Sequence, residues 1–164
     1  MELVVCSGGQ IGSDVAGLRA AKEVGFKTGG WLPKGCITLD GPRPDRIEEF
    51  GMQEHSESGY PPRTWRNVAE TDATIRIATS FLTRGEICTK NAITHYNKPS
   101  LDIRLEDDEI DLVSLIIPTA DWIISNEWQR LNIAGSALSR VELIVKEFLV
   151  EVFTEVKRYS CSSS

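Results

Sequence analysis

The chain has 164 residues, a formal net charge of −6, and 41% hydrophobic and 26% charged residues. This length predicts one domain, which buries enough surface to fold without a metal ion or a disulfide. The acidic balance excludes a general nucleic-acid-binding protein, which carries a basic field. It does not exclude an anionic ligand, because the local charge of a pocket can oppose the overall charge.

The cysteines and histidines form no metal-binding or redox pair. They are widely separated, with no CxxC or CxxH spacing, at Cys6, Cys36, Cys88, Cys161, His55 and His95. This argues against a zinc site and favours a reducing compartment. No apolar run approaches the length of a membrane span, and the N-terminus lacks a basic region followed by a long apolar stretch. We expect a soluble, cytoplasmic protein with no membrane partner.

The chain opens with a strand, a glycine-rich loop and a helix. The apolar run Leu3–Val5 predicts a buried strand, and apolar residues recur at helical spacing over Val15–Val24. Ser13 or Asp14 can cap this helix. The loop between them, Cys6–Asp14, can place backbone N–H groups and a helix N-terminus around an anion.

Three glycines in this loop, Gly8, Gly9 and Gly12, permit positive φ and let a ligand approach the backbone. A tight turn that binds nothing is the alternative, because a glycine-rich turn alone is weak evidence. A carboxylate beside a phosphate would repel it. We therefore expect Asp14 to face a sugar hydroxyl, a cation or the helix cap.

Residues 26–31 predict a second, short strand, and residues 32–62 predict a long loop interrupted throughout by glycine and proline. A loop of this length is usually functional or covers a site. As a lid, it would bring Lys34 or Arg43 over an anionic ligand. For each of these residues we favour the alternative, a solvated surface loop of mixed charge.

The rest of the chain alternates helices and strands. In order, the pattern predicts a helix over 64–70, a strand over 73–78, a loop over 79–89, a helix ending near 97, a strand over 101–103, helical segments over 110–124, a strand over 130–134 and a helix over 139–156.

Pro118 is expected to break the 110–124 helix, because proline lacks the N–H group that a helix interior requires. Trp122 and Trp128 are expected in the core or at an oligomer face. The acidic cluster Glu106–Glu109 is expected to be the solvated start of a helix. Residues 160–164 are expected to be a disordered tail, which leaves residues 1–159 as the domain.

This alternation predicts an α/β fold with a parallel sheet covered on both faces. Ligands of such sheets bind outside the carboxyl ends of the strands. Three loops leave those ends, at 7–14, 79–89 and 135–140, and parallel topology brings them to one edge. A phosphate or a nucleotide suits that site, with Arg84 or Arg140 as the neutralising charge.

Several enzyme signatures are missing. There is no GK[ST] Walker loop and no GxSxG nucleophile motif, and no histidine has an evident serine or cysteine partner. Cys6 ends the first strand, but a buried structural cysteine is the commoner case and no base is evident. We therefore assign no catalytic residue, and leave Asp14, Glu86 or Asp72 as the acid or base of an alternative hydrolase.

Eight sequence blocks, in the same order, resemble those of the putative molybdenum carrier family. They are SGGQIGSD (7–14), TGGWLPKG (28–35), DGP (40–42), SGY (58–60), RT (63–64), NV (67–68), DATI (72–75) and LNIAG (131–135). That family belongs to a Rossmann-like group with the lysine-decarboxylase-like and cytokinin-activating LOG-type proteins. The resemblance implies a Rossmann-like, single-domain fold and binding of molybdenum cofactor, a phosphate-bearing pterin, or of a nucleotide.

The resemblance also implies which residues bind the cofactor: Ser7, Gly8, Gly9, Gln10, Gly12, Asp14, Lys34, Gly35, Arg84, Gly85, Thr89 and Gly135. The chain departs from the family at Ile11, at Val15 and at Ser136-Ala137, where the family usually has Thr, Arg and Pro-Arg. The departures leave the identity of the anion open. Thr83–Glu86 does not reproduce the PGGxGT loop of LOG-type proteins, so phosphoribohydrolase activity is not implied.

The leading hypothesis is a non-catalytic carrier or sensor that holds a small anionic ligand, namely a phosphorylated cofactor, a nucleotide or an oxyanion, in the strand-end crevice. One alternative is a nucleotide-processing hydrolase of the LOG-like type. The other is an oligomeric interaction module with a vestigial pocket. A homo-oligomer formed through the apolar 110–128 region is expected.

Overall fold

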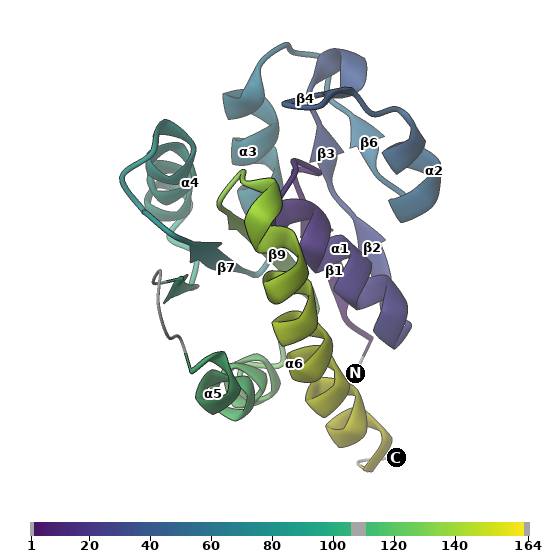
Figure 1. The fold of residues 1–164 in the computed structure, drawn as a ribbon, viewed down its shortest axis with the longest axis vertical. Helices are drawn as coiled ribbons and strands as arrows, with labels where there is room; N and C mark the ends of the chain where they lie inside the picture. Colours follow the sequence, from purple (N-terminus) through teal and green to yellow (C-terminus); the bar gives the residue numbers. More distant parts are fainter. Residues whose placement is uncertain (1, 106–110, 163–164) are drawn as a thin grey trace.

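The computed structural model describes residues 2–105 and 111–162. Its centre is a five-stranded sheet of order β2-β1-β9-β7-β8, in which every neighbouring pair is parallel (Figure 1). This confirms the predicted α/β fold with a Rossmann-like parallel sheet in a single domain. The strands are β1 (Val4–Ser7), β2 (Lys27–Gly29), β7 (Ala73–Ala78), β8 (Ser100–Arg104) and β9 (Arg130–Gly135).

Helices cover both faces of this sheet. One face carries α1, α6 and α5, which pack side by side, and the other carries the pair α3 and α4. Their bounds are α1 (Ser13–Val24), α3 (Tyr60–Ala69), α4 (Arg84–His95), α5 (Leu112–Ser125) and α6 (Glu142–Ser162). Within the part of the chain that the structure describes, none of the helices has the length and apolar character that crossing a membrane requires.

Strand side chains alternate between the two faces. Ile75 and Ile133 belong to the main apolar core with α1 and α6. Thr74 and Asn132 lie on the opposite face, where Asn132 Nδ2 donates a hydrogen bond to Thr74 Oγ1 at 3.3 Å. Arg76 shares that face and donates to a main-chain carbonyl of α4. The α1–α6 face of the sheet is therefore apolar, and the α3–α4 face is polar.

Residues 30–59 are folded rather than a plain loop. The predicted second strand ends early at Gly30, whose φ is 116°, and the chain continues as a separate small sheet of β3 (Trp31–Leu32) and β6 (Gln53–Glu54). Between them lie a 3-10 turn, η1 (Lys34–Cys36), then β4 (Ile37–Thr38), β5 (Gly41–Pro42) and α2 (Asp45–Phe50).

A second apolar cluster orders this segment, with Phe50 and Met52 packed against Leu18 of α1. The glycine and proline residues of this segment predict a loop from local sequence, but the burial of its apolar side chains against α1 gives it a fixed structure.

The start of α1 is not capped as predicted. Its N-cap is Gly12, with φ 83° and no side-chain cap. Ser13 Oγ donates instead to the Ile77 carbonyl at 2.7 Å, and Asp14 Oδ2 accepts from Gln10 N at 3.2 Å. These side chains tie the helix start to its neighbouring loops, so they are not available as caps.

The predicted break of α5 at Pro118 is also wrong, because the helix is continuous. Pro118 lies on its exposed face, where water can bind the Ser114 carbonyl that has lost its donor. Trp122 and Trp128 pack against the main core, with ring centroids 5.8 Å apart.

Two further predictions concern segments at or near the limits of the described residues. The acidic cluster Glu106–Glu109 lies outside the described residues. The last helix, α6, extends to Ser162, past residue 160, where the sequence predicts a disordered tail.

The sheet order places β9, the last of these strands along the chain, at the centre. If β9 is numbered as the first strand, followed by β1, β2, β7 and β8, the order becomes 3-2-1-4-5, which matches the first five strands of the doubly wound dinucleotide-binding order 3-2-1-4-5-6. The end of α6 and the start of β1 lie at the same end of the molecule (Figure 1), so linking them would give that order by circular permutation. The crevice at the reversal of strand order then falls between β9 and β7.

Candidate functional site

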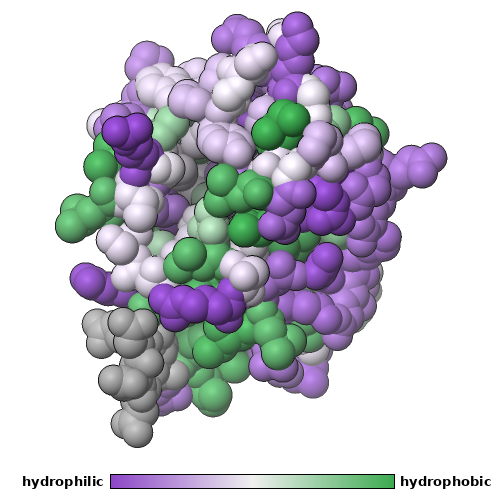
Figure 2. Space-filling view, turned by 45° about the horizontal axis from the view of Figure 1, so that its top comes forward, coloured by the Kyte–Doolittle hydropathy of each residue, from purple (hydrophilic) through white to green (hydrophobic). Residues whose placement is uncertain are grey.

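A cavity of about 570 Å³ opens at this position, outside the carboxyl ends of β7 and β9. Figure 2 turns this edge of the sheet toward the viewer and shows hydrophobic residues interrupting the hydrophilic surface near the middle of the face. All three predicted loops contribute, the first through Gln10 and Asp14, the second through residues between 79 and 89, and the third through residues 134–138. The first turns of α3 and the exposed Leu39 complete the wall.

Ser136 joins the three loops. Its carbonyl accepts from Ser13 N at 3.0 Å, its N–H donates to the Ile77 carbonyl at 3.1 Å, and its hydroxyl accepts from Thr79 N at 2.9 Å. The loops therefore meet at one edge, as the parallel topology predicts.

Half of the residues predicted to bind a cofactor line the cavity: Gln10, Asp14, Arg84, Gly85, Thr89 and Gly135. The other half are absent from its wall: Ser7, Gly8, Gly9, Gly12, Lys34 and Gly35. The second loop is also shorter than predicted, because α4 begins at Arg84, where Thr83 caps the helix and accepts from Glu86 N.

The glycines of the first loop face protein rather than open space. A Cβ on Gly8 would meet the Arg63 guanidinium at 2.0 Å, and one on Gly12 would meet the Ser136 carbonyl at 2.1 Å. The Gly35 N–H is engaged by the Glu54 carboxylate at 2.6 Å. Gly8 and Gly12 thus let the chain pass close to its own neighbours, and anion binding by the first loop stays a prediction.

Arg63 is the main cavity residue that the sequence pattern did not single out. Its guanidinium lies over the Tyr60 ring, 5.6 Å from the centroid, and NH1 donates to Thr64 Oγ1 at 3.0 Å. Its Nε is buried and has no hydrogen-bond partner. The RT block at 63–64, just after the proline-rich start of α3, was the signal available for finding it.

Asp14 is buried beside Arg63, with 3.8 Å between Oδ2 and Arg63 NH1. Burial raises the pKa of Asp14, and the charge of Arg63 and the Gln10 N–H act against that rise. The cavity thus contains a carboxyl group whose ionisation depends on a neighbouring arginine.

A second carboxyl group, Glu86, lies in the first turn of α4 and is only 3% exposed. Arg76 of β7 approaches it, with 3.5 Å between Arg76 NH1 and Glu86 Oε2, and Arg76 also pairs with Asp102 of β8. The Phe81 ring covers this guanidinium at 4.7 Å. Burial raises the pKa of Glu86 to about 7, against the opposing charge of Arg76 and with a smaller contribution from Asp14.

The shifted pKa of Glu86 predicts how stability depends on pH. A carboxyl whose pKa rises on folding stabilises the protein while protonated, and this contribution is lost as pH rises from about 4.5 to about 7. Wild-type protein should lose on the order of 2 kcal/mol of unfolding free energy over that window through this group. Glu86→Gln should remove that loss, as measured by urea unfolding at pH 5 and pH 8.

Glu147→Gln, on the exposed surface of α6, is the matched control and should leave the pH profile unchanged. Identical profiles for wild type and Glu86→Gln would contradict the assignment.

Cys6, the candidate nucleophile, is not part of the cavity wall. Burial raises the pKa of its thiol, and its Sγ accepts from Arg130 NH2 at 3.4 Å. Burial therefore favours the less nucleophilic protonated form. Among the described residues, no group of three or more His, Cys, Asp or Glu side chains is placed to hold a metal ion.

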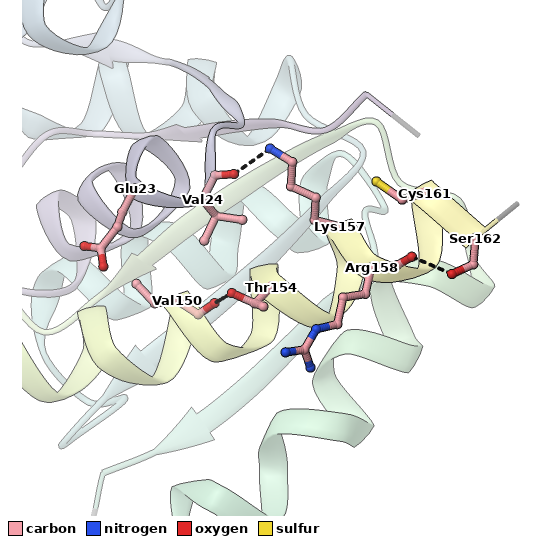
Figure 3. Close-up of a pocket in the computed structure, with 8 residues that line it drawn as sticks. All are labelled: Glu23, Val24, Val150, Thr154, Lys157, Arg158, Cys161 and Ser162. Carbon is pink, nitrogen blue, oxygen red and sulfur yellow. Dashed lines mark hydrogen bonds between the residues drawn. The ribbon is translucent and has the colours of Figure 1, made fainter. Parts of the chain in front are cut away.

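A second, open hollow of about 800 Å³ lies between the ends of α1 and α6, at the opposite edge of the sheet (Figure 3). Its polar groups are engaged locally. Lys157 Nζ donates to the Val24 carbonyl at 2.6 Å, and the Thr154 hydroxyl donates to the Val150 carbonyl at 2.7 Å. It offers less to an anionic ligand than the strand-end cavity does.

Comparison with known proteins agrees with this architecture. The model of the circularly permutated YpsA SLOG family matches residues 5–155. A solved structure described as a putative molybdenum carrier protein from Syntrophus aciditrophicus SB is 31% identical, with a TM-score of 0.78, and the alignment covers 94% of this chain and 95% of that one. No curated protein matches the chain significantly. The family match and the permuted strand order together show that the chain belongs to the circularly permutated YpsA SLOG family, as a molybdenum-carrier-like member.

Proposed function

We propose that this protein is a carrier or sensor that binds a small phosphorylated ligand, either a nucleotide or the molybdenum cofactor, in the strand-end cavity. The observation that carries this proposal is the composition of the cavity wall. This wall contains a helix N-terminus, two arginines, an aromatic ring and aliphatic side chains. One part of the wall therefore suits an anion, and another part suits a flat ring.

The anionic end of the ligand is expected at the start of α4. The N–H groups of Arg84 and Gly85 have no carbonyl partner within the helix, because they belong to its first turn. A Cβ on Gly85 would meet nothing within 4 Å, so the backbone here is open to a ligand. Arg84 adds a positive charge at the mouth of the cavity.

The ring of the ligand is expected against Tyr60, Leu39 and Leu138, which line the cavity. These side chains are 37%, 59% and 40% exposed, and exposed apolar groups that gather at one hollow are typical of a binding site. A planar heterocycle would cover them and stack on the aromatic ring.

The name of the solved relative supports a ligand related to molybdenum. The molybdenum cofactor combines a flat pterin with a phosphate, which are the two features that this wall suits. A nucleotide has the same two features, and the binding panel therefore contains both.

Isothermal titration calorimetry with molybdenum cofactor, molybdate, GMP, AMP and ADP-ribose tests the proposal. At least one phosphorylated ligand should bind with a Kd below 1 mM. Arg84→Met should weaken that binding by about tenfold, the effect of losing one charge-assisted hydrogen bond. Lys90→Met, on the same helix but outside the cavity wall, is the control and should bind as wild type. No binding across the panel would refute the proposal.

A nucleotide-processing hydrolase is the second candidate. The observation in its favour is that Glu86 and Asp14, both with raised pKa values, line one cavity, an arrangement common in acid–base catalysis. Incubation of each nucleotide with the protein, followed by chromatography, distinguishes the two candidates. A product that forms with wild type and not with Asp14→Asn would favour the hydrolase.

A cytoplasmic location and a homo-oligomer remain part of this proposal. Val113 and Ile117 of α5 and Leu143 of α6 are 75%, 53% and 65% exposed, and apolar surface of this kind favours association. Light scattering during size-exclusion chromatography measures the oligomeric state directly.

A further inference from the structure

Glu86 contains a buried acceptor atom that the protein leaves without a donor. The side chain is 3% exposed and lines the strand-end cavity, yet its Oε2 has no hydrogen-bond partner. A buried acceptor without a partner is costly, and native structures provide a donor from protein, water or ligand. The cavity is the direction from which such a donor can come.

Arg76 pairs with Glu86 through charge, but it makes no hydrogen bond to Oε2, and three of its five N–H groups donate to other atoms. Its Nε donates to Asp102 Oδ1 at 2.8 Å, and its NH2 donates to Asp102 Oδ2. Its NH1 donates to the main-chain carbonyl of Glu86 at 3.2 Å, which leaves Oε2 at 3.5 Å with electrostatic attraction only. Arg76 therefore attracts the Glu86 carboxylate but donates no hydrogen bond to Oε2.

The other charged groups around Glu86 do not supply a donor either. Asp14 of α1 and Asp102 of β8 are acids that act on Glu86 through their charge, and Arg76 of β7 is the cation opposing them. Arg63 of α3 pairs with Asp14 instead, with 3.8 Å between its NH1 and Asp14 Oδ2. Arg84 lies in the same helical turn as Glu86, on the exposed side.

We propose that Glu86 is the specificity-determining residue of the cavity: its unpartnered Oε2 accepts a hydrogen bond from a neutral N–H or O–H group of the bound ligand. This rests on the proposed function. It also fixes the orientation of the ligand. A phosphate beside Glu86 would be repelled, so the phosphate lies outward at Arg84 and the donor-bearing part lies inward at Glu86.

Two sources of that donor fit the chemistry. One is the edge of a 2-amino-4-oxo ring, as in guanine or a pterin, and the other is a sugar hydroxyl group. Both hydrogen-bond more strongly to the ionised carboxylate than to the neutral acid, which keeps only a weaker carbonyl acceptor. Binding therefore favours the ionised form, and since the pKa of Glu86 is about 7, up to about half a proton is released per protein on binding at pH 7.

The experiment is calorimetric titration of GMP into the protein at pH 7, in two buffers that differ in ionisation enthalpy, which yields the number of protons released. Wild type should release up to about half a proton more than Glu86→Gln. The phosphate of GMP also titrates near pH 6, but its contribution is the same for both proteins and cancels in the difference. Between pH 6 and pH 8, the affinity for GMP should also rise roughly threefold to tenfold more in wild type than in Glu86→Gln.

Two further probes identify the donor. AMP lacks the N1–H and 2-amino groups, so loss of the excess proton release with AMP assigns the donor to the ring. dGMP lacks the 2′-hydroxyl, so loss with dGMP assigns it to the sugar. Excess proton release that survives with both AMP and dGMP supports a donor that each of these ligands has, which is the 3′-hydroxyl group or, in AMP, the 6-amino group.

GMP binding with equal proton release in wild type and Glu86→Gln would overturn the inference and leave the proposed function intact. Excess proton uptake by wild type would also overturn it, because Glu86 would then be the donor. If no ligand of the full panel binds, including the molybdenum cofactor, this inference and the proposed function both fail. Ionisation of the phosphate between pH 6 and pH 8 can tighten binding by at most about twofold. A larger gain by wild type alone therefore tests the inference even if Glu86→Gln does not fold.

Discussion

Gly135→Ala is expected to abolish soluble, folded protein. Gly135 ends β9 with φ 148°, and a Cβ there would lie 1.8 Å from the Ile77 carbonyl oxygen and 2.6 Å from its carbon. These are backbone atoms of the neighbouring strand, and that carbonyl also accepts hydrogen bonds from Ser136 N and Ser13 Oγ. Because neither strand can move without separating the loops at the cavity, the cost should exceed about 4 kcal/mol. Soluble expression and thermal unfolding measure it.

Gly85→Ala is the matched control for this experiment. Gly85 also lines the cavity, but an added Cβ meets nothing within 4 Å. Alanine in the first turn of α4 should leave stability unchanged or raise it by up to about 1 kcal/mol. A Gly135→Ala protein as stable as Gly85→Ala would show that β7 and β9 are not held as closely as described.

Arg76→Met is expected to give the second-largest loss of stability. Arg76 is 3% exposed and faces Glu86 and Asp102, whose charges it compensates. Removing one partner of a buried ion pair costs about 3–5 kcal/mol, because the remaining charge stays buried. The loss should be largest at pH 8 and smaller at pH 5, where Glu86 is protonated in the folded state. Urea unfolding at both pH values measures it.

Arg158→Met provides the control, since the Arg158 side chain is 70% exposed and pairs with Glu155 on the surface of α6. It should change the unfolding free energy by less than about 1 kcal/mol. Equal losses for the two arginine variants, or a larger loss for Arg76→Met at pH 5, would contradict the description of the buried network.

The sheet could be predicted closely from local pattern. Ala73–Ala78 is β7 with the predicted bounds, and β9 extends the predicted strand by one residue. β7 is buried throughout and β9 over its middle three residues, so their runs of mainly apolar residues are a direct signal. Pro118 shows where this approach fails, because whether a proline breaks a helix depends on which face meets solvent.

The convergence of three loops could be predicted because parallel topology alone requires it. The role of each residue at that edge could not. Gly8 and Gly12 suggest an anion cradle only while their neighbours are unknown, and the structure fills that space with Arg63 and Ser136. Arg63 itself comes from α3, outside the three loops.

Glu86 presents a related difficulty. Its position in the first turn of α4 is that of an ordinary acidic residue near a helix N-terminus. Its burial beside Arg76, whose guanidinium Phe81 covers, makes it unusual, and neither contact can be recognised from spacing along the chain.

The central position of β9 has a consequence for how the protein is made. Until residues 130–135 leave the ribosome, β1 and β7 each lack the partner that lies between them, and their inner edges stay open. Such edges invite pairing with other chains, so the nascent polypeptide passes through a stage that depends on protection from aggregation. No ligand can assist folding before this stage ends, because a wall of its cavity has not yet been synthesised.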